Sequence, residues 1–468
     1  MIARPNAMEA AERAMRRVAE GGRFVWLFCE AGNGDRTLHY VTEFDGKLEF
    51  VSGAVPESGE IASITEAVPA ARWHEQEVHN RFGVRFNGSS DHPPIIKSPE
   101  QDAEQLRRAL GDEVSTVLYG PIRSGIVESA CWIIETAGED FIAVHPSMFF
   151  KHRGLEKRFE GAALELAPFI AEHVSGVTPS SHAVAFCRAV EAVCGIDVPS
   201  RARAARTILV ELERVHQHLD SLAKLADDGS LSIGSAQTFA AKERVHRLLS
   251  DGTGHRFGRG SICVGGTRSD VFGTLRTAAE RGLEVLERET LAVLQGLFGT
   301  QSLLDRLIGT GRLSRDTVHA YGGVGPVARG SGIVNDARLT DGWIYAPPEA
   351  PAAIEFDADA MARARIREAE IRQSFRLVRA ALDAAPTGAS CVNQEHIQGN
   401  GEAYTRVESP QGELLYFVRY DDALVRVAIR SASFANWPLF VPSLPGNIFT
   451  DFSFIEHSFG LVQSETDR

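Results

Sequence analysis

The stretch RARAARTILVELERVHQHLDSLAKLADDG at residues 201–229 decides the fold of this chain. Its apolar residues recur at spacings of four, three, four and three, so they form one stripe along a helix. The stripe consists of Ile208, Leu212, Val215, Leu219 and Leu222. Pro199 opens the helix, and an acidic loop that contains Gly229 ends it. The pattern predicts a long helix that packs one face into a helical core.

The segments around this helix extend the same core. A serine at 180 or 181 is expected to cap a helix that runs to Gly195, and 236–250, 274–299 and 357–384 repeat the helical period. The last of these carries the stripe Ile371, Phe375, Val378 and Leu382. CWIIETA (131–137) and DFIAV (140–144) predict short strands, and ELLYFVR (413–419) and ALVRVAIR (423–430) predict a hairpin. Residues 111–468 are therefore expected to form a mainly helical bundle with small sheets at its edge.

Residues 1–110 are expected to form a separate, small α+β domain. An amphipathic helix opens the chain, and FVWLFCE (24–30) is a compact apolar run. TLHYVTEF (37–44) and KLEFVSG (47–53) are joined by Asp45 and Gly46, a pair that favours positive φ in a two-residue hairpin. The Gly, Ser, Asp and Pro residues of 77–100 predict an irregular tail at the domain boundary. The fold class is α+β.

Composition restricts the classes of function. Among 468 residues, 49 are basic and 62 acidic, and the net charge of −13 argues against nucleic acid as the main partner. No signal peptide opens the chain, and no stretch reaches the roughly 20 apolar residues of a membrane-spanning helix. The six cysteines form no CxxC pair, which fits a reducing compartment and predicts buried, unreactive thiols. The chain is expected to be soluble or held at a membrane by partners.

Taken singly, the polar motifs are not specific. The glycine-rich segment 321–332 lacks GK[ST], so it predicts an ordered loop and no nucleotide site. Glu211, Arg214 and His218 share one row of the 200–225 helix. Such a row is usually a packed polar network between helices, and it marks function only where it lines a cavity.

Several motifs, taken in order, resemble a known family. ARWHEQEVHNRFGVRF (71–86) resembles the signature of the C subunit of bacterial NADH–quinone oxidoreductase, the 30 kDa type. YGPIRSGIVES (119–129), KHRGLEK (151–157), VGGTRSD (264–270), VGPVARGSG (324–332), RSASFANWP (430–438) and ETDR (465–468) occur in the order found in the D subunit of that enzyme. The large subunits of formate hydrogenlyase-type, hydrogenase-4-like membrane-bound hydrogenases share this order. The chain thus resembles a fusion of C-like and D-like domains, and the resemblance implies a fold like the large subunit of nickel–iron hydrogenases.

The resemblance also places the nickel–iron ligands, and this chain lacks them. In the hydrogenases two CxxC pairs supply four thiolates, because soft sulfur stabilises these metals. The corresponding positions here are Ser175 and Thr178 in the first segment and Val462 and Glu465 in the second. The sequence also stops at Arg468, like the D subunit, without the tail that such hydrogenases lose during metal insertion. We expect no metal bound by this chain and no hydrogenase activity.

For complex I-like members, the resemblance implies a quinone pocket in the vacated metal chamber. The family uses a His, a Tyr and an Asp there; the matching positions are Arg123, Phe150 and Asp228. His152 matches its motif, and Glu128 matches an acidic residue that the hydrogenases use for proton transfer. Glu128, His152 and Asp228 are therefore the candidate proton-relay residues. The expected pocket-lining residues are Arg123, Phe150, Ser175, Thr178, Val462 and Glu465.

Two arginines, Arg268 and Arg329, allow two interpretations. In this family, arginines in the segments of Arg268 and Arg329 lie near the cluster or the cavity, where a fixed positive charge raises a cluster's potential. A structural ion pair is an equally good interpretation of each.

The resemblance implies partners and leaves two functions open. A small iron–sulfur partner of the B type would carry a [4Fe–4S] cluster, and membrane-arm subunits would hold the assembly peripherally on the inner face of the plasma membrane. This chain alone is expected to bind no cofactor, with quinone at the interface as substrate. In the first interpretation the chain shapes a pocket for quinone or another electron acceptor. In the second it is a structural or coupling subunit that joins the cluster-bearing partner to the membrane arm.

Overall fold

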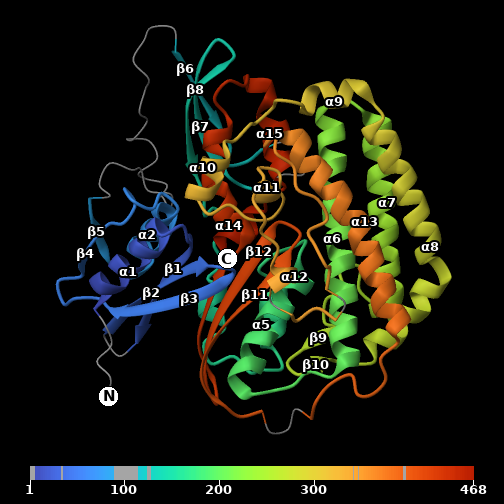
Figure 1. The fold of residues 1–468 in the computed structure, drawn as a ribbon, viewed down its shortest axis with the longest axis horizontal. Helices are drawn as coiled ribbons and strands as arrows, with labels where there is room; N and C mark the ends of the chain where they lie inside the picture. The colour runs from blue at the N-terminus through green and yellow to red at the C-terminus, as the bar shows by residue number, and fades with distance from the viewer. Residues whose placement is uncertain are drawn as a thin grey trace.

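The computed structural model describes residues 6–32, 35–88, 114–123, 128–340, 342–345, 347–393 and 397–468. Figure 1 shows an N-terminal α+β unit beside a larger part in which sheets lie next to a layer of long helices. The expected boundary between residues 110 and 111 lies outside the described residues. None of the described helices is long and apolar enough to cross a membrane.

The N-terminal unit contains one meander and a small parallel pair. Its elements are α1 (Ala7–Ala19), β1 (Arg23–Gly32), β2 (Asp35–Phe44), β3 (Lys47–Ala54), β4 (Glu60–Ala62), α2 (Ala71–Phe82) and β5 (Arg85–Asn87). The strands β1, β2 and β3 pair in that order, and β4 pairs with β5 in parallel. Asp45 and Gly46 both have positive φ, so the predicted hairpin turn is confirmed. The irregular tail predicted from residue 77 was wrong at its start, because α2 continues to Phe82 and β5 follows.

Two three-stranded antiparallel sheets belong to the larger part. One is β6 (Val114–Tyr119), β7 (Cys131–Ala137) and β8 (Asp140–Ser147), and the other is β11 (Asn400–Ser409), β12 (Gly412–Asp421) and β13 (Leu424–Arg430). A short ladder joins β9 (Ile262–Cys263) to β10 (Gly266–Thr267). The predicted strands are confirmed, while β11 was not predicted.

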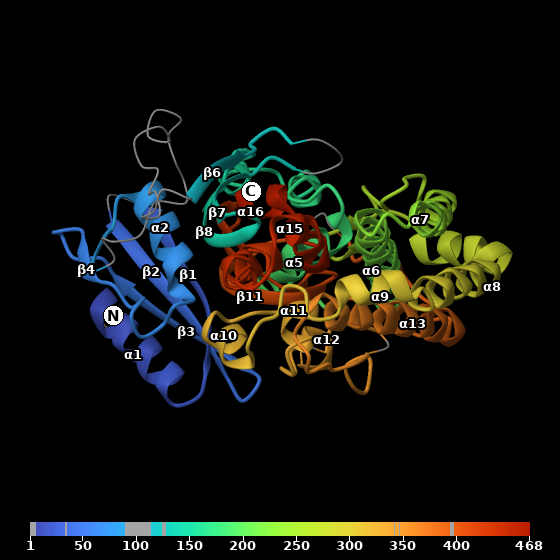
Figure 2. The same cartoon turned by 90° about the horizontal axis from the view of Figure 1, so that it is seen from above.

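Five long helices form the main core: α5 (Pro179–Cys194), α6 (Ser200–Asp228), α7 (Ser232–Thr253), α8 (Val271–Phe298) and α13 (Ala360–Ala384). Figure 2 shows α6, α7, α8 and α13 together at the end of the molecule away from the N-terminal sheet. The five stripe residues of α6 are at most 1% exposed, which confirms the predicted core face. The shorter helices are α3 (Leu155–Arg158), α4 (Ala167–Glu172), α9 (Gln301–Leu307), α10 (Arg315–Ala320), α11 (Gly325–Arg329), α12 (Ala337–Thr340), α14 (Ala432–Asn436), α15 (Phe452–Phe459) and α16 (Gln463–Asp467).

The start of α5 differs from the prediction. Ser180 and Ser181 lie inside the helix and do not cap it. Their backbone N–H groups donate instead to the carboxylate of Glu213 on α6, over 2.7 and 3.0 Å. A buried carboxylate thus satisfies the free donors at this helix N-terminus, where negative charge is favoured.

The cysteine prediction was only partly right. Cys29, Cys131, Cys187 and Cys263 are buried, but Cys194 and Cys391 are half-buried. The sulfur atoms of Cys263 and Cys391 lie 3.6 Å apart.

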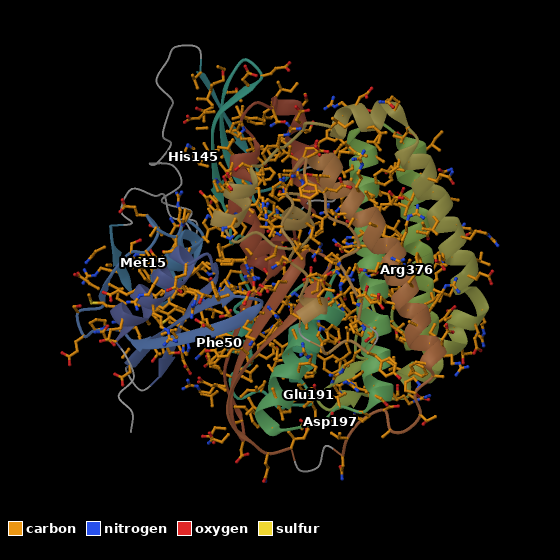
Figure 3. The ribbon with its side chains drawn as sticks, viewed as in Figure 1. Met15, Phe50, His145, Glu191, Asp197 and Arg376 are labelled. Atoms are coloured by element: carbon orange, nitrogen blue, oxygen red, sulfur yellow. The ribbon has the colours of Figure 1, made fainter. Side chains whose placement is uncertain are left out.

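The N-terminal sheet packs directly against β11 and β12. Phe50 of β3, labelled in Figure 3, lies where the two sheets meet, and its ring stacks on Tyr404 at a centroid distance of 3.6 Å. Arg23 donates to Glu413 across the same junction over 2.9 Å, and Arg430 donates to the backbone oxygen of Val25. Stacked rings and buried charge pairs therefore hold the two parts together.

A second junction is a buried ion cluster around Glu156. Its carboxylate contacts Arg81 of α2 at 2.9 Å, Arg426 of β13 at 3.0 Å and Arg468 at 3.4 Å. Arg81 and Arg468 also pair with Glu77 of α2. Burial alone would raise the pKa of Glu156, but the three arginines outweigh it and hold that pKa well below its usual range.

The variant Glu156→Gln removes the charge that three buried or half-buried arginines share. We expect it to lower the free energy of unfolding by about 3–5 kcal/mol, because breaking a buried ion pair leaves charge uncompensated. Denaturant titration measures this loss. The matched variant Glu160→Gln breaks the exposed pair with Lys157 and should cost about 0–1 kcal/mol. Equal effects of the two variants would contradict a structural role of the cluster.

The Glu213 carboxyl gives the stability a pH dependence. Burial raises its pKa to about 7, whereas a glutamate in an unfolded chain titrates near 4.3. Protonated Glu213 makes its full contribution to the free energy of unfolding below about pH 4.3. This contribution is lost as the pH rises through about 7. We expect Glu213→Gln to lose less free energy of unfolding than the wild type over this range. Parallel pH curves for the two proteins would disprove the assignment; the exposed Glu280→Gln serves as control.

Candidate functional site

A cavity of about 220 Å³ lies between α6, the loop at 176–177 and the segment 456–463. Glu128 of the first motif, Lys242 of α7 and Val462 also line it. The two segments that carry the replaced thiolate positions therefore meet at one cavity, and Glu128 is in its wall.

On one side of the cavity, an aspartate is paired with two lysines. Asp220 on α6 accepts from Lys224 at 2.8 Å and from Lys242 at 2.7 Å. Burial tends to raise the pKa of Asp220, but the two ammonium groups outweigh it and lower that pKa. This carboxylate stays ionised and is fully engaged.

Arg123 acts from behind the cavity wall. Its buried guanidinium donates to both oxygens of Glu456 at 2.8 and 2.9 Å and to the backbone oxygen of Glu128 at 3.0 Å. Glu456 lines the cavity and Arg123 does not. Arg123 thus neutralises Glu456 and ties the first motif to α15.

Glu128 lies in the wall with a half-exposed carboxylate. One oxygen accepts from the backbone N–H of Ser464 at 2.9 Å, and the other lies 3.3 Å from the ammonium of Lys151. The side chain is therefore held at the cavity and still reaches solvent.

Asp228 reaches the cavity through a residue that the sequence analysis missed. Its Oδ2 lies 2.6 Å from Nδ1 of His457, and His457 lines the cavity. The two residues are 229 positions apart, so no helical or strand period connects them. The available signal was a Glu–His pair inside the apolar run FSFIEHSF at 452–459.

The first two replaced ligand positions form one small hydrogen-bonded unit. Ser175 and Thr178 are fully buried, and the Thr178 hydroxyl donates to that of Ser175 at 2.6 Å. The Thr178 backbone N–H also donates to the Ser175 hydroxyl, at 3.2 Å. These oxygens are occupied with each other.

Val462 and Glu465, the other two replaced ligand positions, are also hydrogen-bonded within the protein. Glu465 is fully buried and accepts from the Ser433 hydroxyl at 2.7 Å, and the same hydroxyl accepts from the Val462 N–H at 3.1 Å. Nε2 of His182 lies 3.4 Å from Glu465, and its Nδ1 lies 2.9 Å from the Tyr416 hydroxyl.

A nickel–iron centre does not fit these residues. Two hydroxyls bonded to each other, one alkyl group and one buried carboxylate offer no soft donor set. Across the described ranges, no group of three or more His, Cys, Asp or Glu residues is arranged to hold a metal ion.

His152 and Phe150 lie outside this cavity. The His152 ring is exposed, with Nδ1 2.7 Å from the backbone oxygen of Asp467, and Phe150 is 41% exposed. The Asp467 carboxylate accepts from the N–H groups of Phe149 and Lys151 at 3.0 and 2.8 Å. Burial raises the pKa of Asp467 to about 6. The structure thus places Glu128 in the cavity wall and Asp228 against a residue of that wall, while His152 and Phe150 do not line the cavity.

The two named arginines have different surroundings. Arg329 is fully buried and pairs with Glu370 at 2.5 Å and Glu408 at 2.8 Å, which confirms a structural ion pair. Arg268 donates to the backbone oxygen of Glu165 at 2.6 Å and stacks over a phenylalanine ring. Neither lines the cavity.

The polar row of α6 belongs to the same buried network as Arg329. His218 lies 2.8 Å from Glu370, and Arg214 pairs with Glu211 at 3.2 Å. Burial lowers the pKa of His218 to about 4, even though Glu370 opposes that shift. The interpretation as a packed polar network is confirmed. The glycine-rich segment 321–332 is ordered and contains α11, so the predicted loop includes one short helix.

Three family models match this chain. The respiratory-chain NADH dehydrogenase 49 kDa subunit model matches residues 229–399 and 390–468. The 30 kDa subunit model of the same enzyme matches residues 5–109, and the nickel-dependent hydrogenase model matches residues 153–226.

Individual proteins are similar over most of the chain. Formate hydrogenlyase subunit 5 of Escherichia coli (strain K12) is 28% identical, over 95% of this chain and 85% of that protein. Membrane-bound hydrogenase subunit alpha of Pyrococcus furiosus is 30% identical, over 75% of this chain and 86% of that protein. A chain in the structure of an archaeal membrane-bound sulfane sulfur reductase has the same fold, with a TM-score of 0.71 at 24% identity. The match covers 77% of this chain and 100% of that chain.

These matches agree with the order of motifs and with the two-part architecture. The chain belongs to the family of the 49 kDa subunit of respiratory-chain NADH dehydrogenase, and it is a large subunit of the complex I-like and hydrogenase-4-like type with a 30 kDa subunit-like N-terminal part.

Proposed function

We propose that this chain serves a membrane-associated oxidoreductase complex, in which a quinone head group or another small electron acceptor is reduced in the cavity beside α6. A small iron–sulfur partner of the B type, with a [4Fe–4S] cluster, supplies the electrons. Membrane-arm subunits hold the chain peripherally at the inner face of the plasma membrane. No nickel takes part.

One observation carries this proposal: Glu128, the 176–177 loop and Val462 line the same cavity. These are the segments on which the family builds its reaction chamber. The volume of about 220 Å³ is below the roughly 300–1,000 Å³ of sites that enclose drug-sized ligands. The cavity therefore suits a single-ring head group or a smaller acceptor.

Reduction of a quinone needs protons as well as electrons, so an acid must lie within hydrogen-bond reach of its oxygens. The wall offers Glu128, whose carboxylate is fixed by the Ser464 N–H and also contacts solvent. Asp228 lies one residue behind the wall. His152 is outside the cavity, and we propose that it exchanges protons with solvent near Lys151 and Asp467.

A structural role is the second candidate, and a specific observation favours it. Ser175, Thr178 and Glu465 are fully buried and bonded internally, so the space of a metal centre is filled by protein. In that case the chain would join a cluster-bearing partner to a membrane arm and would reduce nothing itself.

Blocking the cavity separates the two candidates. Val177 lines the cavity and is half-buried, so Val177→Trp places an indole in the space for the acceptor. We expect the purified complex to lose at least about 90% of its quinone reductase activity. Co-purification of the partner subunits shows that the variant assembles. Unchanged activity in an assembled complex would leave the structural role.

The proton-relay residues are tested in the same assay. We expect Glu128→Gln to lower kcat by about 10²-fold, the usual size of a general acid's contribution, and His152→Ala to lower it less. The matched control Glu280→Gln removes an exposed carboxylate from α8. Full activity in both relay variants would rule out the relay and leave the cavity assignment standing.

A further inference from the structure

We propose that Cys263 and Cys391 form an oxidation site, at which a disulfide of low molecular mass converts the two thiols to a cross-link that locks β9 to the segment 390–392. Neither cysteine lines the cavity beside α6. The inference therefore does not rest on the proposed function. The motif resemblance assigns no role to either cysteine.

The two cysteines approach one residue of a small ladder from opposite sides. In the hairpin of β9 and β10, Cys263 pairs with Gly266. On the other side of β10, Gly266 forms an antiparallel bridge with Cys391. Beside this bridge the Thr267 N–H donates to the backbone oxygen of Ser390 over 2.8 Å. Backbone pairing thus fixes both cysteines relative to the same glycine.

Gly266 leaves the space in which the sulfur atoms meet. Sγ of Cys263 lies 3.6 Å from Sγ of Cys391, which is van der Waals contact. A Cβ atom at position 266 would lie 2.7 Å from the Cα atom of Cys391, closer than packed atoms come. The S–S bond of a disulfide is about 2.0 Å long, so the sulfurs must approach by about 1.6 Å. Small rotations of the two side chains provide that shift.

A buried ion pair holds the hairpin that carries Cys263. Arg206 of α6 donates to Glu191 of α5 at 2.5 and 3.0 Å. The same guanidinium donates to the backbone oxygen of Cys263 at 2.7 Å, and the Gly265 N–H donates to Glu191 at 2.7 Å. Figure 1 shows β9 and β10 at one end of α6. Cys263 is therefore held in place, and closing the bond needs movement mainly from Cys391.

A small reagent reaches the pair from two sides. Cys263 lines a second cavity, of about 360 Å³, together with Glu165, Tyr420 and Asp422. Cys391 is half-buried, so its thiol is the more exposed of the two. Accessible thiols are the ones that react with disulfides, because the attacking group must reach the reagent's sulfur. Cys391 is therefore the residue that reacts first.

Cys187, on the neighbouring α5, does not compete for the reagent. Its side chain is fully buried, and burial raises the pKa of its thiol well above the usual value. Since the thiolate is the nucleophile, this thiol stays inert.

The reaction is a thiol–disulfide exchange in two steps. The Cys391 thiolate attacks one sulfur of the reagent, whose S–S bond breaks, and the first reagent thiolate leaves and takes up a proton. The Cys263 thiolate then attacks the Cys391 sulfur of the mixed disulfide and releases the second reagent thiolate, which is protonated as well. One S–S bond breaks and one forms. Two electrons pass from the cysteine pair to the reagent, and the two thiol protons end on the two released thiols.

The cross-link closes a covalent loop between positions 128 residues apart, and this loop contains α8 and α13 of the helical core. A closed loop has fewer unfolded conformations, so the oxidised chain should resist unfolding more than the reduced chain. In a reducing compartment such a bond forms transiently, when the balance of thiols and disulfides shifts toward oxidation.

The experiment treats the purified full chain with glutathione disulfide, blocks the remaining thiols with N-ethylmaleimide and maps tryptic peptides by mass spectrometry. We expect peptide 260–268 joined to peptide 380–406 in most of the wild-type chain. Dithiothreitol should reduce the joined peptide to less than about a tenth of that amount. The oxidised chain should unfold at a higher denaturant concentration than the reduced chain, and Cys391→Ser should abolish this difference. Cys194→Ser, which removes another half-buried thiol, should keep the joined peptide.

Gly266→Ala tests the geometry while both thiols remain. Its methyl group displaces the backbone of Cys391, so we expect the yield of the joined peptide to fall at least about tenfold. The matched variant Gly282→Ala has open space around its Cβ and should keep the wild-type yield. A wild-type yield from Gly266→Ala would overturn the argument from geometry.

The wild-type peptide map decides the inference even where Gly266→Ala does not fold. If the two cysteines carry glutathione or maleimide separately, or if Cys391 is joined to Cys194 or Cys187, the inference is wrong. A joined peptide without any change in the unfolding midpoint would disprove the locking role of the bond.

Discussion

The arrangement of this molecule depends on the burial of charge in one short segment, residues 462–468. Glu465 and Arg468 are almost completely buried, and a buried charge is tolerated only when it is paired and hydrogen-bonded. Glu465 is bound to Ser433 beside His182, and Arg468 to Glu77 and Glu156. The N-terminal unit, α3, α5 and α14 are therefore fixed to the same seven residues. Because the Ser464 N–H holds Glu128, the cavity wall is fixed by this segment too.

This pairing explains how the fold persists without a metal. A nickel–iron centre would join the 175–178 and 462–465 segments through four thiolates. Here each segment closes on itself or on a neighbour: Thr178 donates to Ser175, and Ser433 links the Val462 N–H to Glu465. Protein interiors leave few voids, and these short contacts tie each segment to its surroundings without a metal. The open volume lies beside it, along α6.

Local sequence patterns predicted the elements that are stabilised by residues close together in the sequence. The period of α6 and the Asp45–Gly46 turn need only neighbouring residues, and both are as expected. The start of α5 was misplaced because its stabilising carboxylate, Glu213, lies on another helix. The strand β11 was missed since NGEAYTRVES (400–409) has few apolar residues and gains its burial from β12 and α5. Motif order located Glu128 and Asp228, but the ring that joins Asp228 to the cavity lies 229 residues away.

The energetics of the wall argue against a cavity that is only a packing defect. Genuinely empty cavities in proteins are lined by apolar groups. Here the charged side chains of Glu128, Asp220, Lys224, Lys242 and Glu456 line the cavity. Asp220 is held by the two lysines, and Glu456 is held by Arg123. Each of these two carboxylates is therefore compensated while it stays in the wall, so the space keeps a polar lining that a packing defect would lack.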